Sequence, residues 1–397
     1  MIQEFRNNAL KVCLVCSAFD PATVYGGPIV SNLNLATGLR AHGVDLMVLT
    51  TNAMKDRRSE VPVDKDVDHS GGFKVRYFHD TIVGRYSFSM MASIGRYLKD
   101  ADIVHATDVF SFSFILAKIY SLRNGSTLFL SCRGMISDWG FQKKGILKKL
   151  WLKLFVMSWS EKTVLHATSA QEEQELKEYL PNIDVVVVPN SIEIPDKTGV
   201  QSDQSNKLLS DLGVTENTRL ITGLGRLHKK KGFPLLISAF NEIYQSDENT
   251  RLLIAGQDYG ELDELKYKVD ELGIGHVVRI SPQLNNIAKN EVLRHTHIFV
   301  MPSHHENFGN VYLEALSHGV PIVASTNTPW ECVLASECGA WVDNTVEDIV
   351  RGIRMLMASD YNVISKNAIE LAATFSVEKT SELMLKHYSE ARREHFS

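Results

Sequence analysis

Short apolar runs alternate with segments of helical periodicity along nearly all of the 397 residues. Buried parallel strands are short and apolar, and helices form the crossovers between them. Residues 25–43 resemble such a crossover, because apolar residues recur at helical spacing from Ile29 to Leu39. The alternation predicts an α/β protein with parallel sheets covered on both faces. The strand candidates are residues 11–19, 44–51, 73–78, 102–107, 126–131, 163–168, 184–189, 219–225, 250–256, 276–281, 297–303 and 320–326.

A polar stretch interrupts this rhythm near the middle of the chain. Residues 190–207 contain Pro, Gly, Ser and charges with little periodicity, which is typical of a linker. A length of 397 residues at about 150 residues per domain favours two domains. We therefore expect two doubly wound domains whose ligands bind beyond the carboxyl ends of the strands. Helices are expected after the linker at residues 233–246, 261–272, 287–294, 309–318 and 362–395.

Composition and charge exclude several classes of protein. Apolar residues make up 44 % of the chain and charged residues 22 %, which is ordinary for a globular protein and excludes a disordered one. A net charge of −5 argues against general nucleic-acid binding, so no nucleic-acid partner is expected. The sequence has no secretory signal and no run of about 18 apolar residues, so we expect a cytoplasmic protein.

The cysteines and one acidic motif do not predict a metal site. The five cysteines are scattered, which favours reduced thiols. Cys13 and Cys16 form a C-x-x-C pattern inside a strand candidate, but odd spacing on a strand sends two side chains to opposite faces. Residues 64–69 contain an Asp-x-Asp in what reads as a polar loop, and we expect no metal there.

The strongest local signal is a pair of acidic residues around a helix start. Glu306 and Glu314 lie eight residues apart, after the strand candidate 297–303. Phe308, Gly309 and Asn310 fall where the next helix begins, and a helix start favours a phosphate. A carboxylate inside the helix can accept both hydroxyls of a ribose. The alternative is an ordinary strand–loop–helix with two solvated acids.

A basic turn precedes the helix expected at residues 233–246. Gly223 and Gly225 end a strand candidate, and Arg226 with Lys229, Lys230 and Lys231 follows directly. Such a cluster is repulsive unless it is solvated or neutralised by an anion, and Arg with Lys suits a diphosphate. A solvated basic turn is the alternative. No Walker pattern is present.

Two features of the first half are weaker candidates. Gly26 and Gly27, followed by Pro28, form a tight turn between a strand and a helix, where phosphate or substrate loops often lie. The spacing of a dinucleotide fingerprint is missing. His105 is expected at a strand end, where active-site side chains commonly emerge, although a structural role is the alternative.

The segment 133–159 combines lysines with aromatic and aliphatic residues. Five lysines lie between residues 143 and 153, and no acid occurs between Asp138 and Glu161. On a helix this composition gives a basic amphipathic face, which suits an anionic membrane surface through residues 141–159. The alternative is a core-packed helix with a solvated basic face.

Taken in order, these motifs resemble those of the retaining glycosyltransferases of family 4, which have the GT-B fold. The resemblance covers nearly the whole chain. It rests on the glycine turn at 25–28, the run around His105, the segment 185–193, the basic turn at 223–233 and the Glu306–Glu314 spacing.

The resemblance implies a metal-independent enzyme that takes a nucleotide-sugar donor and needs no cofactor. Arg226 and Lys231 would hold the donor diphosphate and replace a divalent ion in neutralising it. Glu314 would bind the ribose, and Glu306 would contact the transferred sugar. The amides that support the sugar or phosphate would be those of Phe308, Gly309, Asn310 and Val311. The implied mechanism is front-face displacement with retention.

The resemblance also implies roles for the first domain. His105 would lie near the reacting centre, and Gly26 and Gly27 would touch phosphate or acceptor. Arg133 and Gly134 would line the acceptor side. The expected organisation is an acceptor-binding Rossmann-like domain over 1–190, a donor-binding one over 191–377 facing it across a cleft, and a last helix, 378–397, packed back on the first.

Several functions remain open at this point. We favour transfer of a hexose or N-acetylhexosamine from a UDP-sugar to a lipid-linked or lipopolysaccharide-type glycan, by a cytoplasmic or peripheral membrane enzyme. A mannosyltransferase that uses GDP-mannose is one alternative. A sugar-nucleotide epimerase or a phosphorylase of the same fold is another, and a non-catalytic sugar-nucleotide sensor is a third.

Overall fold

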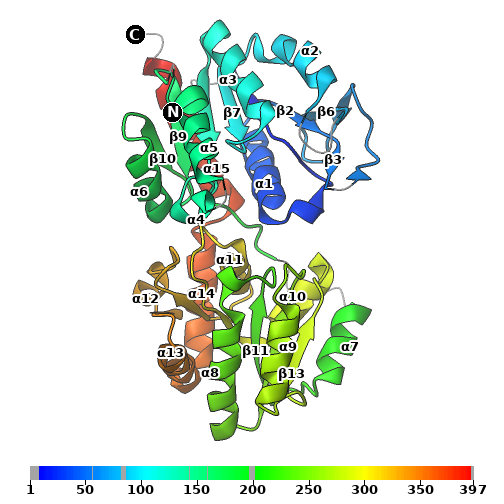
Figure 1. The fold of residues 1–397 in the computed structure, drawn as a ribbon, viewed down its shortest axis with the longest axis vertical. Helices are drawn as coiled ribbons and strands as arrows, with labels where there is room; N and C mark the ends of the chain where they lie inside the picture. The colour runs from blue at the N-terminus through cyan, green and yellow to red at the C-terminus, as the bar shows by residue number, and fades with distance from the viewer. Residues whose placement is uncertain are drawn as a thin grey trace. The chain divides into compact units, whose positions relative to one another are not determined.

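The computed structural model describes residues 9–55, 57–81, 86–142, 144–158, 160–195 and 202–394. The chain forms two compact units, Met1–Glu193 with Phe375–Ser397, and Ile194–Thr374. Each unit is described by itself. The chain therefore leaves the first unit and returns to it near its end, as the colours in Figure 1 show.

The first unit is built on one sheet. Within its described part, the strands pair in the order β10-β9-β8-β7-β1-β2-β6-β5, and all neighbours are parallel except β5 and β6. The strand order reverses at β1, which has β2 on one side and β7 on the other. This reversal is the switch point of the sheet, so ligands are expected beyond the carboxyl ends of β1 and β7. The strands are β1 Lys11–Val15, β2 Asp45–Thr51, β5 Asp66–Asp68, β6 Lys74–Phe78, β7 Ile103–Thr107, β8 Thr127–Ser131, β9 Thr163–Ala167 and β10 Asp184–Val187. A separate hairpin joins β3 Ala53–Met54 and β4 Arg57–Arg58.

Helices cover both faces of this sheet. The core on one face joins Cys16 with residues of α1 (Gly27–Ala41) and α15 (Val377–Glu394), and the core on the other joins Cys13 with residues of α2 (Phe88–Leu98) and α3 (Phe112–Asn124). The two cysteines thus point to opposite faces, as their spacing predicts, and the chain's cysteines are free thiols. The other helical segments are η2 Thr23–Tyr25, α4 Asp138–Phe141, α5 Gly145–Trp151, η3 Leu152–Val156 and α6 Ala170–Tyr179.

Helix α15 belongs to the first unit because it packs closely on α1. A Cβ on Gly38 would lie 2.5 Å from Ser381 Oγ, so only a glycine allows this approach. Tyr388 of α15 is fully buried in the core beside Phe129 of β8, with ring centroids 4.7 Å apart. Residues 377–394 therefore form part of the first unit.

The acidic segment 64–69 is a strand in part and not only a loop, which corrects the sequence interpretation. Residues Asp66–Asp68 form the edge strand β5. Asp66 Oδ1 accepts hydrogen bonds from Arg76 Nη1 at 2.9 Å and from Tyr97 Oη at 2.8 Å. Burial raises the pKa of Asp66, but these two hydrogen bonds outweigh it and hold the pKa below its usual range. The carboxylate is thus occupied by protein donors.

The second unit also has one parallel sheet. Its strands pair in the order β13-β12-β11-β14-β15-β16 in the described residues. The first strand of the unit, β11, therefore lies beside the fourth, β14, which is the strand order of a Rossmann sheet with its switch point between these two strands. The strands are β11 Arg219–Leu224, β12 Thr250–Ala255, β13 Val278–Ser281, β14 Thr296–Met301, β15 Ile322–Ser325 and β16 Gly339–Val342.

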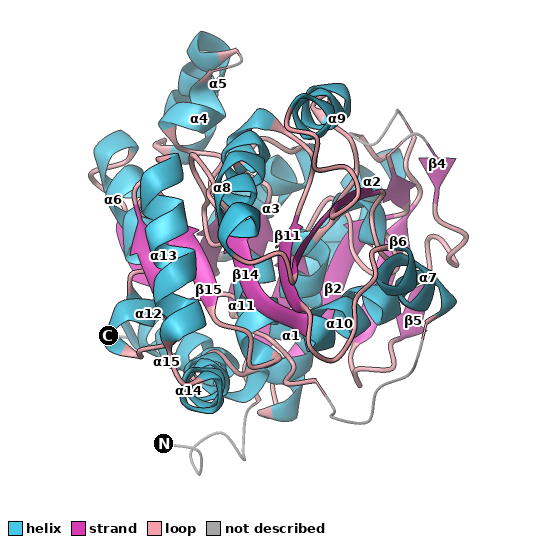
Figure 2. Cartoon of the chain, turned by 90° about the horizontal axis from the view of Figure 1, so that it is seen from below, coloured by secondary structure: helices cyan, strands magenta, loops and turns pink. Residues whose placement is uncertain are grey.

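Helices lie on both faces of the second sheet as well. Figure 2 shows α8 (Phe233–Ser246) and α13 (Val346–Ala358) on one face and α11 (Asn310–Ser317) on the other. The parallel α/β architecture predicted from the sequence is confirmed in both units. The other helices of this unit are α7 Asp203–Asp211, η4 Lys229–Lys231, α9 Leu262–Glu271, α10 Asn286–His295, α12 Cys332–Ala335 and α14 Tyr361–Ala373.

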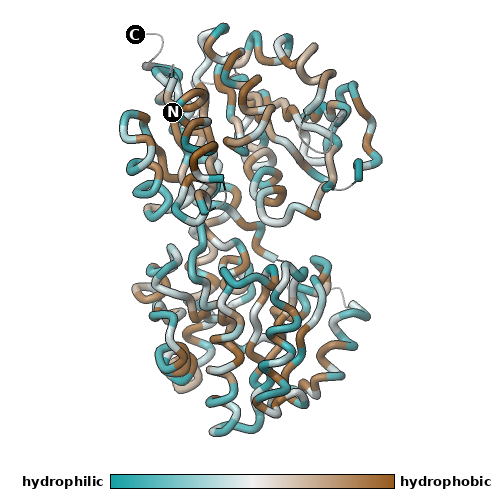
Figure 3. Tube along the Cα trace, viewed as in Figure 1, coloured by the Kyte–Doolittle hydropathy of each residue, from teal (hydrophilic) through white to brown (hydrophobic). Residues whose placement is uncertain are grey.

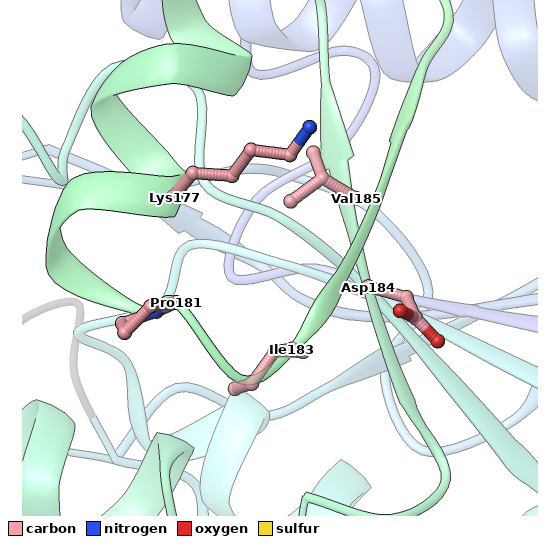
Figure 4. A pocket seen from close by; sticks show the side chains of 5 residues that line it. All are labelled: Lys177, Pro181, Ile183, Asp184 and Val185. Atoms are coloured by element: carbon pink, nitrogen blue, oxygen red, sulfur yellow. The ribbon is translucent and has the colours of Figure 1, made fainter.

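A pocket on the first unit lies away from these switch points. It is lined by the end of α6 and the beginning of the edge strand β10, as Figure 4 shows. Asp184 opens β10, so the pocket lies at the amino end of that parallel strand, opposite the edge where ligands of such sheets bind. Its lining residues are Lys177, Pro181, Ile183, Asp184 and Val185.

Candidate active site

The second unit carries the predicted basic and acidic groups at its switch point. Arg226 follows β11, and Lys231 ends the short helix η4 that comes next. Glu306 follows β14, the neighbour of β11 in the sheet. Because the carboxyl ends of adjacent parallel strands meet at one edge, residues 75 positions apart in sequence come into contact there.

That contact is an ion pair between Lys231 Nζ and Glu306 Oε2. The Lys231 and Glu306 side chains are only 11 % and 15 % exposed, so water screens the pair weakly. Burial by itself would raise the pKa of Glu306, but Lys231, Lys230 and Arg226 outweigh it and hold the pKa below its usual range. Glu306 is therefore ionised at neutral pH and surrounded by positive charge.

Arg226 is an exposed member of this cluster. Its guanidinium carbon lies 5.4 Å from the centre of the Tyr259 ring, in a cation–π contact that limits its orientation. A fork of N–H donors beside a lysine ammonium is suited to an anion with several oxygens. The cluster can thus bind and neutralise a diphosphate.

The start of α11 is shaped by Gly309. This residue has φ 79°, and a Cβ there would lie 2.8 Å from Glu306 Cγ and 2.7 Å from the Tyr312 ring. Phe308 is buried, and its carbonyl accepts a hydrogen bond from Trp330 Nε1 at 2.6 Å. Asn310 and Val311 are then the first two residues of the helix, so the positive end of α11 lies beside Glu306.

Glu314 lies inside α11 and has a partner that the sequence analysis missed. Its Oε2 is 2.8 Å from Nζ of Lys289, a residue of α10. No sequence signal distinguishes Lys289, because it stands in an ordinary polar helix 25 residues before Glu314. The structure thus gives each acid of the pair a lysine of its own.

The first unit places its predicted glycines at the start of α1. Gly26 has φ 75°, and Gly27 is the first residue of the helix, followed by Pro28. The backbone N–H of Lys55 donates a hydrogen bond to Tyr25 Oη at 2.7 Å, which brings the β3–β4 hairpin beside this turn. The turn follows β1, so it lies at the switch point of the first sheet.

Arg133 and Gly134 follow β8 and are held by polar groups of the same unit. Arg133 donates to Asn32 Oδ1 at 2.7 Å and to Asn190 Oδ1 at 3.1 Å. The backbone N–H of Gly134 donates to Glu172 Oε1 at 2.7 Å. Arg133 thus joins the helix that starts at the glycine turn to the segment that leaves the unit.

Asp108 was missed by the sequence analysis and stands beside this group. Asp108 directly follows β7. Arg133 follows the neighbouring strand β8, with one residue between them. Both have a left-handed backbone, φ 68° for Asp108 and φ 48° for Arg133, which costs energy for a residue other than glycine and is common at functional sites. Burial raises the pKa of Asp108, against the opposing effects of Ser17 and Arg133. Its position one residue past a strand candidate was the available signal.

His105 does not end a strand, which is a second correction. It is the third of five residues in β7 and is fully buried. Burial, with smaller effects of His166 and Arg133, lowers the pKa of His105 well below its usual range, so the ring is neutral. A strand-end position would expose the side chain, whereas a mid-strand position in a two-sided sheet packs it into the core.

The ring of His105 is part of a hydrogen-bond chain across the core. The carbonyl of Val188 accepts from His166 Nε2 at 2.7 Å, and burial lowers the pKa of His166 to about 3. The Ser131 hydroxyl therefore donates to His166 Nδ1 and accepts from His105 Nε2, both at 2.6 Å. His105 Nδ1 then accepts from the Tyr388 hydroxyl. Both ring nitrogens of His105 are occupied by hydrogen bonds within the core. This arrangement favours the structural role, which was the alternative to a role in the active site.

The basic segment 141–159 is helical from Gly145 to Val156, but the type of helix changes after Trp151. It contains the short helices α5 and η3, the latter with π-helical hydrogen bonds, and Lys143 and Trp159 lie outside the described residues. Leu152 and Val156 are buried, and Trp151 Nε1 donates to the carbonyl of Val109 at 2.9 Å. One face of the segment is therefore packed on the first unit.

The described residues contain neither a metal-binding cluster nor a helix able to span a membrane. No group of three or more His, Cys, Asp or Glu side chains is arranged to hold a metal ion in the described ranges. Across the same ranges, no helix combines the length and apolarity that crossing a bilayer requires.

Comparisons with known proteins cover both units. The family model of the glycosyl transferase 4-like domain matches residues 26–191, and that of the glycosyl transferases group 1 matches residues 205–371. A sequence relative, an uncharacterized glycosyltransferase of Methanocaldococcus jannaschii, is 25 % identical over 335 residues, which are 80 % of each chain.

Solved structures share the fold over nearly the full length. The Anabaena protein HepE, in complex with UDP-glucose, has a TM-score of 0.71 at 17 % identity and covers 96 % of this chain and 100 % of its own. WaaG, a glycosyltransferase involved in lipopolysaccharide biosynthesis, has a TM-score of 0.65 at 18 % identity and covers 94 % and 98 %.

Proposed function

Because the chain belongs to the group 1 and 4-like glycosyltransferases and has the GT-B fold, we propose that it moves a hexose or N-acetylhexosamine from a UDP-sugar to a glycan hydroxyl. The proposed acceptor is lipid-linked or of the lipopolysaccharide type. Support for the donor comes from HepE, whose structure holds UDP-glucose, and support for the acceptor comes from WaaG.

The observation that carries this proposal is the cluster at the switch point of the second unit. Lys231 and Arg226 place positive charge beside Glu306 and the start of α11, where a diphosphate with a sugar attached finds cations, helix dipole and a carboxylate together. In the proposed roles, Lys231 and Arg226 hold the diphosphate and Glu306 binds the transferred sugar. Glu314 accepts hydrogen bonds from the ribose, and the amides from Phe308 to Val311 support the phosphate.

We propose a front-face displacement with retention. The bond between the sugar and the diphosphate breaks as the acceptor oxygen bonds to the same carbon, and the leaving phosphate oxygen takes the proton of the acceptor hydroxyl. Arg226 and Lys231 stabilise the negative charge that develops on the leaving group, which is the role a divalent ion plays elsewhere. The reaction should then proceed at an unchanged rate in EDTA, and a rate lost in EDTA and restored by Mg²⁺ would contradict it.

The first unit would bind the acceptor. Arg133, Gly134 and the glycine turn at Gly26 and Gly27 lie around its switch point, and Asp108 adds a carboxylate that can accept a hydrogen bond from a sugar hydroxyl. We assign no catalytic role to His105, because its ring nitrogens bind Ser131 and Tyr388.

Product analysis separates this function from the alternatives. Thermal shift of the full chain with UDP, GDP and their sugars identifies the donor, since a ligand of the folded state raises apparent stability. Incubation with the responding sugar nucleotide should release free nucleoside diphosphate in proportion to glycosylated acceptor. A larger shift with GDP-mannose favours the mannosyltransferase, and an isomerised sugar nucleotide without acceptor indicates the epimerase. Binding without turnover of any acceptor would refute the transferase.

We also propose that the enzyme works at the cytoplasmic face of a membrane, through a surface formed by α5 and η3. Figure 3 shows hydrophobic residues along this part of the chain. Large apolar side chains are exposed there although the opposite face of the segment is packed, and Lys144, Lys149 and Lys153 are exposed among them. The exposed apolar residues are Ile146 at 86 %, Leu147 at 64 %, Leu154 at 52 %, Leu150 at 51 % and Met157 at 42 %.

An anionic bilayer fits both properties of this surface. Burying a leucine or isoleucine side chain stabilises by about 1.5–3 kcal/mol, and each lysine near an anionic leaflet adds about 1 kcal/mol. A second copy of the chain does not fit this surface, because its own copy of the surface carries the same lysines and the like charges would repel each other. The lipid-linked acceptor proposed above would be found at such a surface.

Vesicle sedimentation tests this surface. The full chain should pellet with phosphatidylglycerol vesicles and much less with phosphatidylcholine vesicles. Ile146→Ser with Leu150→Ser, and separately Lys149→Glu with Lys153→Glu, should reduce pelleting, whereas Lys366→Glu on the second unit should not. Unchanged pelleting of both double variants would refute the membrane role, as would concentration-dependent dimers without vesicle binding.

A further inference from the structure

Each acid of the Glu306–Glu314 pair is held by a lysine from another element. Lys231 binds Glu306, and Lys289 Nζ lies 2.8 Å from Glu314 Oε2. Lys289 stands in the first turn of α10, which follows β13, so the pair lies toward the carboxyl edge of the second sheet. The two side chains are 23 % and 20 % exposed. The proposed function uses Lys231 but gives Lys289 no part.

We propose that Lys289 is a positioning residue for recognition of the donor's ribose. It fixes the rotamer of Glu314, so that the remaining lone pairs of the carboxylate meet the ribose 2′ and 3′ hydroxyls. A carboxylate offers about four acceptor positions, and the single bond to Lys289 leaves the others for the diol. This inference rests on the proposed function, because it assumes that Glu314 binds the ribose.

The place of this pair distinguishes it from other ion pairs of the second unit. Lys207–Asp211 and Lys366–Glu370 each join residues four apart on one exposed helix face, where an ion pair contributes little. Lys289 and Glu314 join two helices at the ligand edge and are mostly shielded from water. A pair that only tied α10 to α11 would affect stability and would not discriminate between nucleotides.

The size of the effect follows from the freedom that Glu314 would regain. Immobilising one long side chain on binding weakens affinity by roughly 3- to 10-fold, and without Lys289 this loss would fall on ribose binding. The loss should be small for a nucleotide that lacks the 2′ hydroxyl, because Glu314 then has less to recognise. Discrimination between ribose and deoxyribose is therefore the informative readout.

Calorimetric titration of the full chain with UDP and with 2′-deoxy-UDP tests the inference. The wild-type chain should prefer UDP, and Lys289→Met, which keeps the aliphatic stem, should lower UDP affinity roughly 3- to 10-fold. Its affinity for 2′-deoxy-UDP should change less, so the ratio falls. Lys366→Met removes a lysine from an exposed pair of the same unit and should change neither affinity.

A double variant separates positioning from stability. In a Glu314→Gln background, adding Lys289→Met should cause no further loss of UDP affinity. Equal loss for both nucleotides, an unchanged ratio, or full additivity with Glu314→Gln would overturn the role of Lys289 while leaving the proposed function intact. A wild-type chain that binds neither UDP nor GDP would refute the proposed function itself, and the inference with it.

Discussion

Replacing Lys231 by methionine removes the ammonium that pairs with Glu306 and keeps most of the buried aliphatic stem. That stem packs on the strand end, since a Cβ on Gly225 would lie 3.3 Å from Lys231 Cε. If Lys231 stabilises charge on the leaving diphosphate, its loss should lower kcat by about 100- to 1,000-fold, the usual effect of removing one electrostatic stabiliser. The variant should remain folded.

The same substitution should change the pH dependence. Burial raises the pKa of Glu306, and Lys231 is the largest influence that lowers it. Without Lys231 the effect of burial is less opposed, so the pKa of Glu306 rises. Activity that needs the ionised carboxylate is lost as pH falls through this pKa, so the acid limb of the profile should move to higher pH. The stability that the pair contributes to the wild-type chain is likewise lost on acidification.

Initial rates with the responding sugar nucleotide, measured between pH 4.5 and 8.5, check both effects. Lys229→Met is the matched control, because Lys229 is an exposed lysine of the same short helix. It should stay within about threefold of the wild type, as surface charges do. A Lys231→Met profile with an unmoved acid limb would refute the electrostatic coupling to Glu306, even if the rate falls.

Three further substitutions test the packing of the two units. Gly309→Ala places a Cβ at φ 79° and 2.8 Å from Glu306 Cγ, so transfer should fall about tenfold or more in a rate assay; wild-type rates would contradict the described turn. Tyr388→Phe leaves His105 Nδ1 without its donor and should lower the unfolding free energy by about 1–3 kcal/mol in urea titrations, and a neutral result would argue against the hydrogen-bond chain. Gly38→Val forces α1 away from Ser381 and should speed hydrogen exchange in α15, whereas unchanged exchange there would contradict the close approach.

The sequence predicted the sheets well because their strands are buried on both faces. Runs such as 219–225 and 250–256 are mostly apolar and became β11 and β12. Four strands of the described residues were missed. The hairpin strands β3 and β4 have only two residues each, and the edge strand β5 is polar, Asp-Val-Asp, because it is exposed. The strand β16, Gly339–Val342, begins with Gly and Ala, which strands disfavour.

The site was predictable where local sequence determines the local shape. Gly309 and the glycine turn at Gly26 need left-handed backbone, which the residue type itself signals. Contacts between distant residues were not predictable. Nothing in the sequence places Lys289 against Glu314. The sequence also does not show that His105 lies in the middle of its strand and not at the end.

Hydrogen exchange of the full chain with and without UDP tests the central claim most directly, with GDP as the comparison nucleotide. If the cations after β11 and the start of α11 bind the donor diphosphate, exchange should slow at residues 225–231 and 303–314 when the preferred nucleotide is added. Binding with protection confined to other segments, and none at these two, would contradict the account.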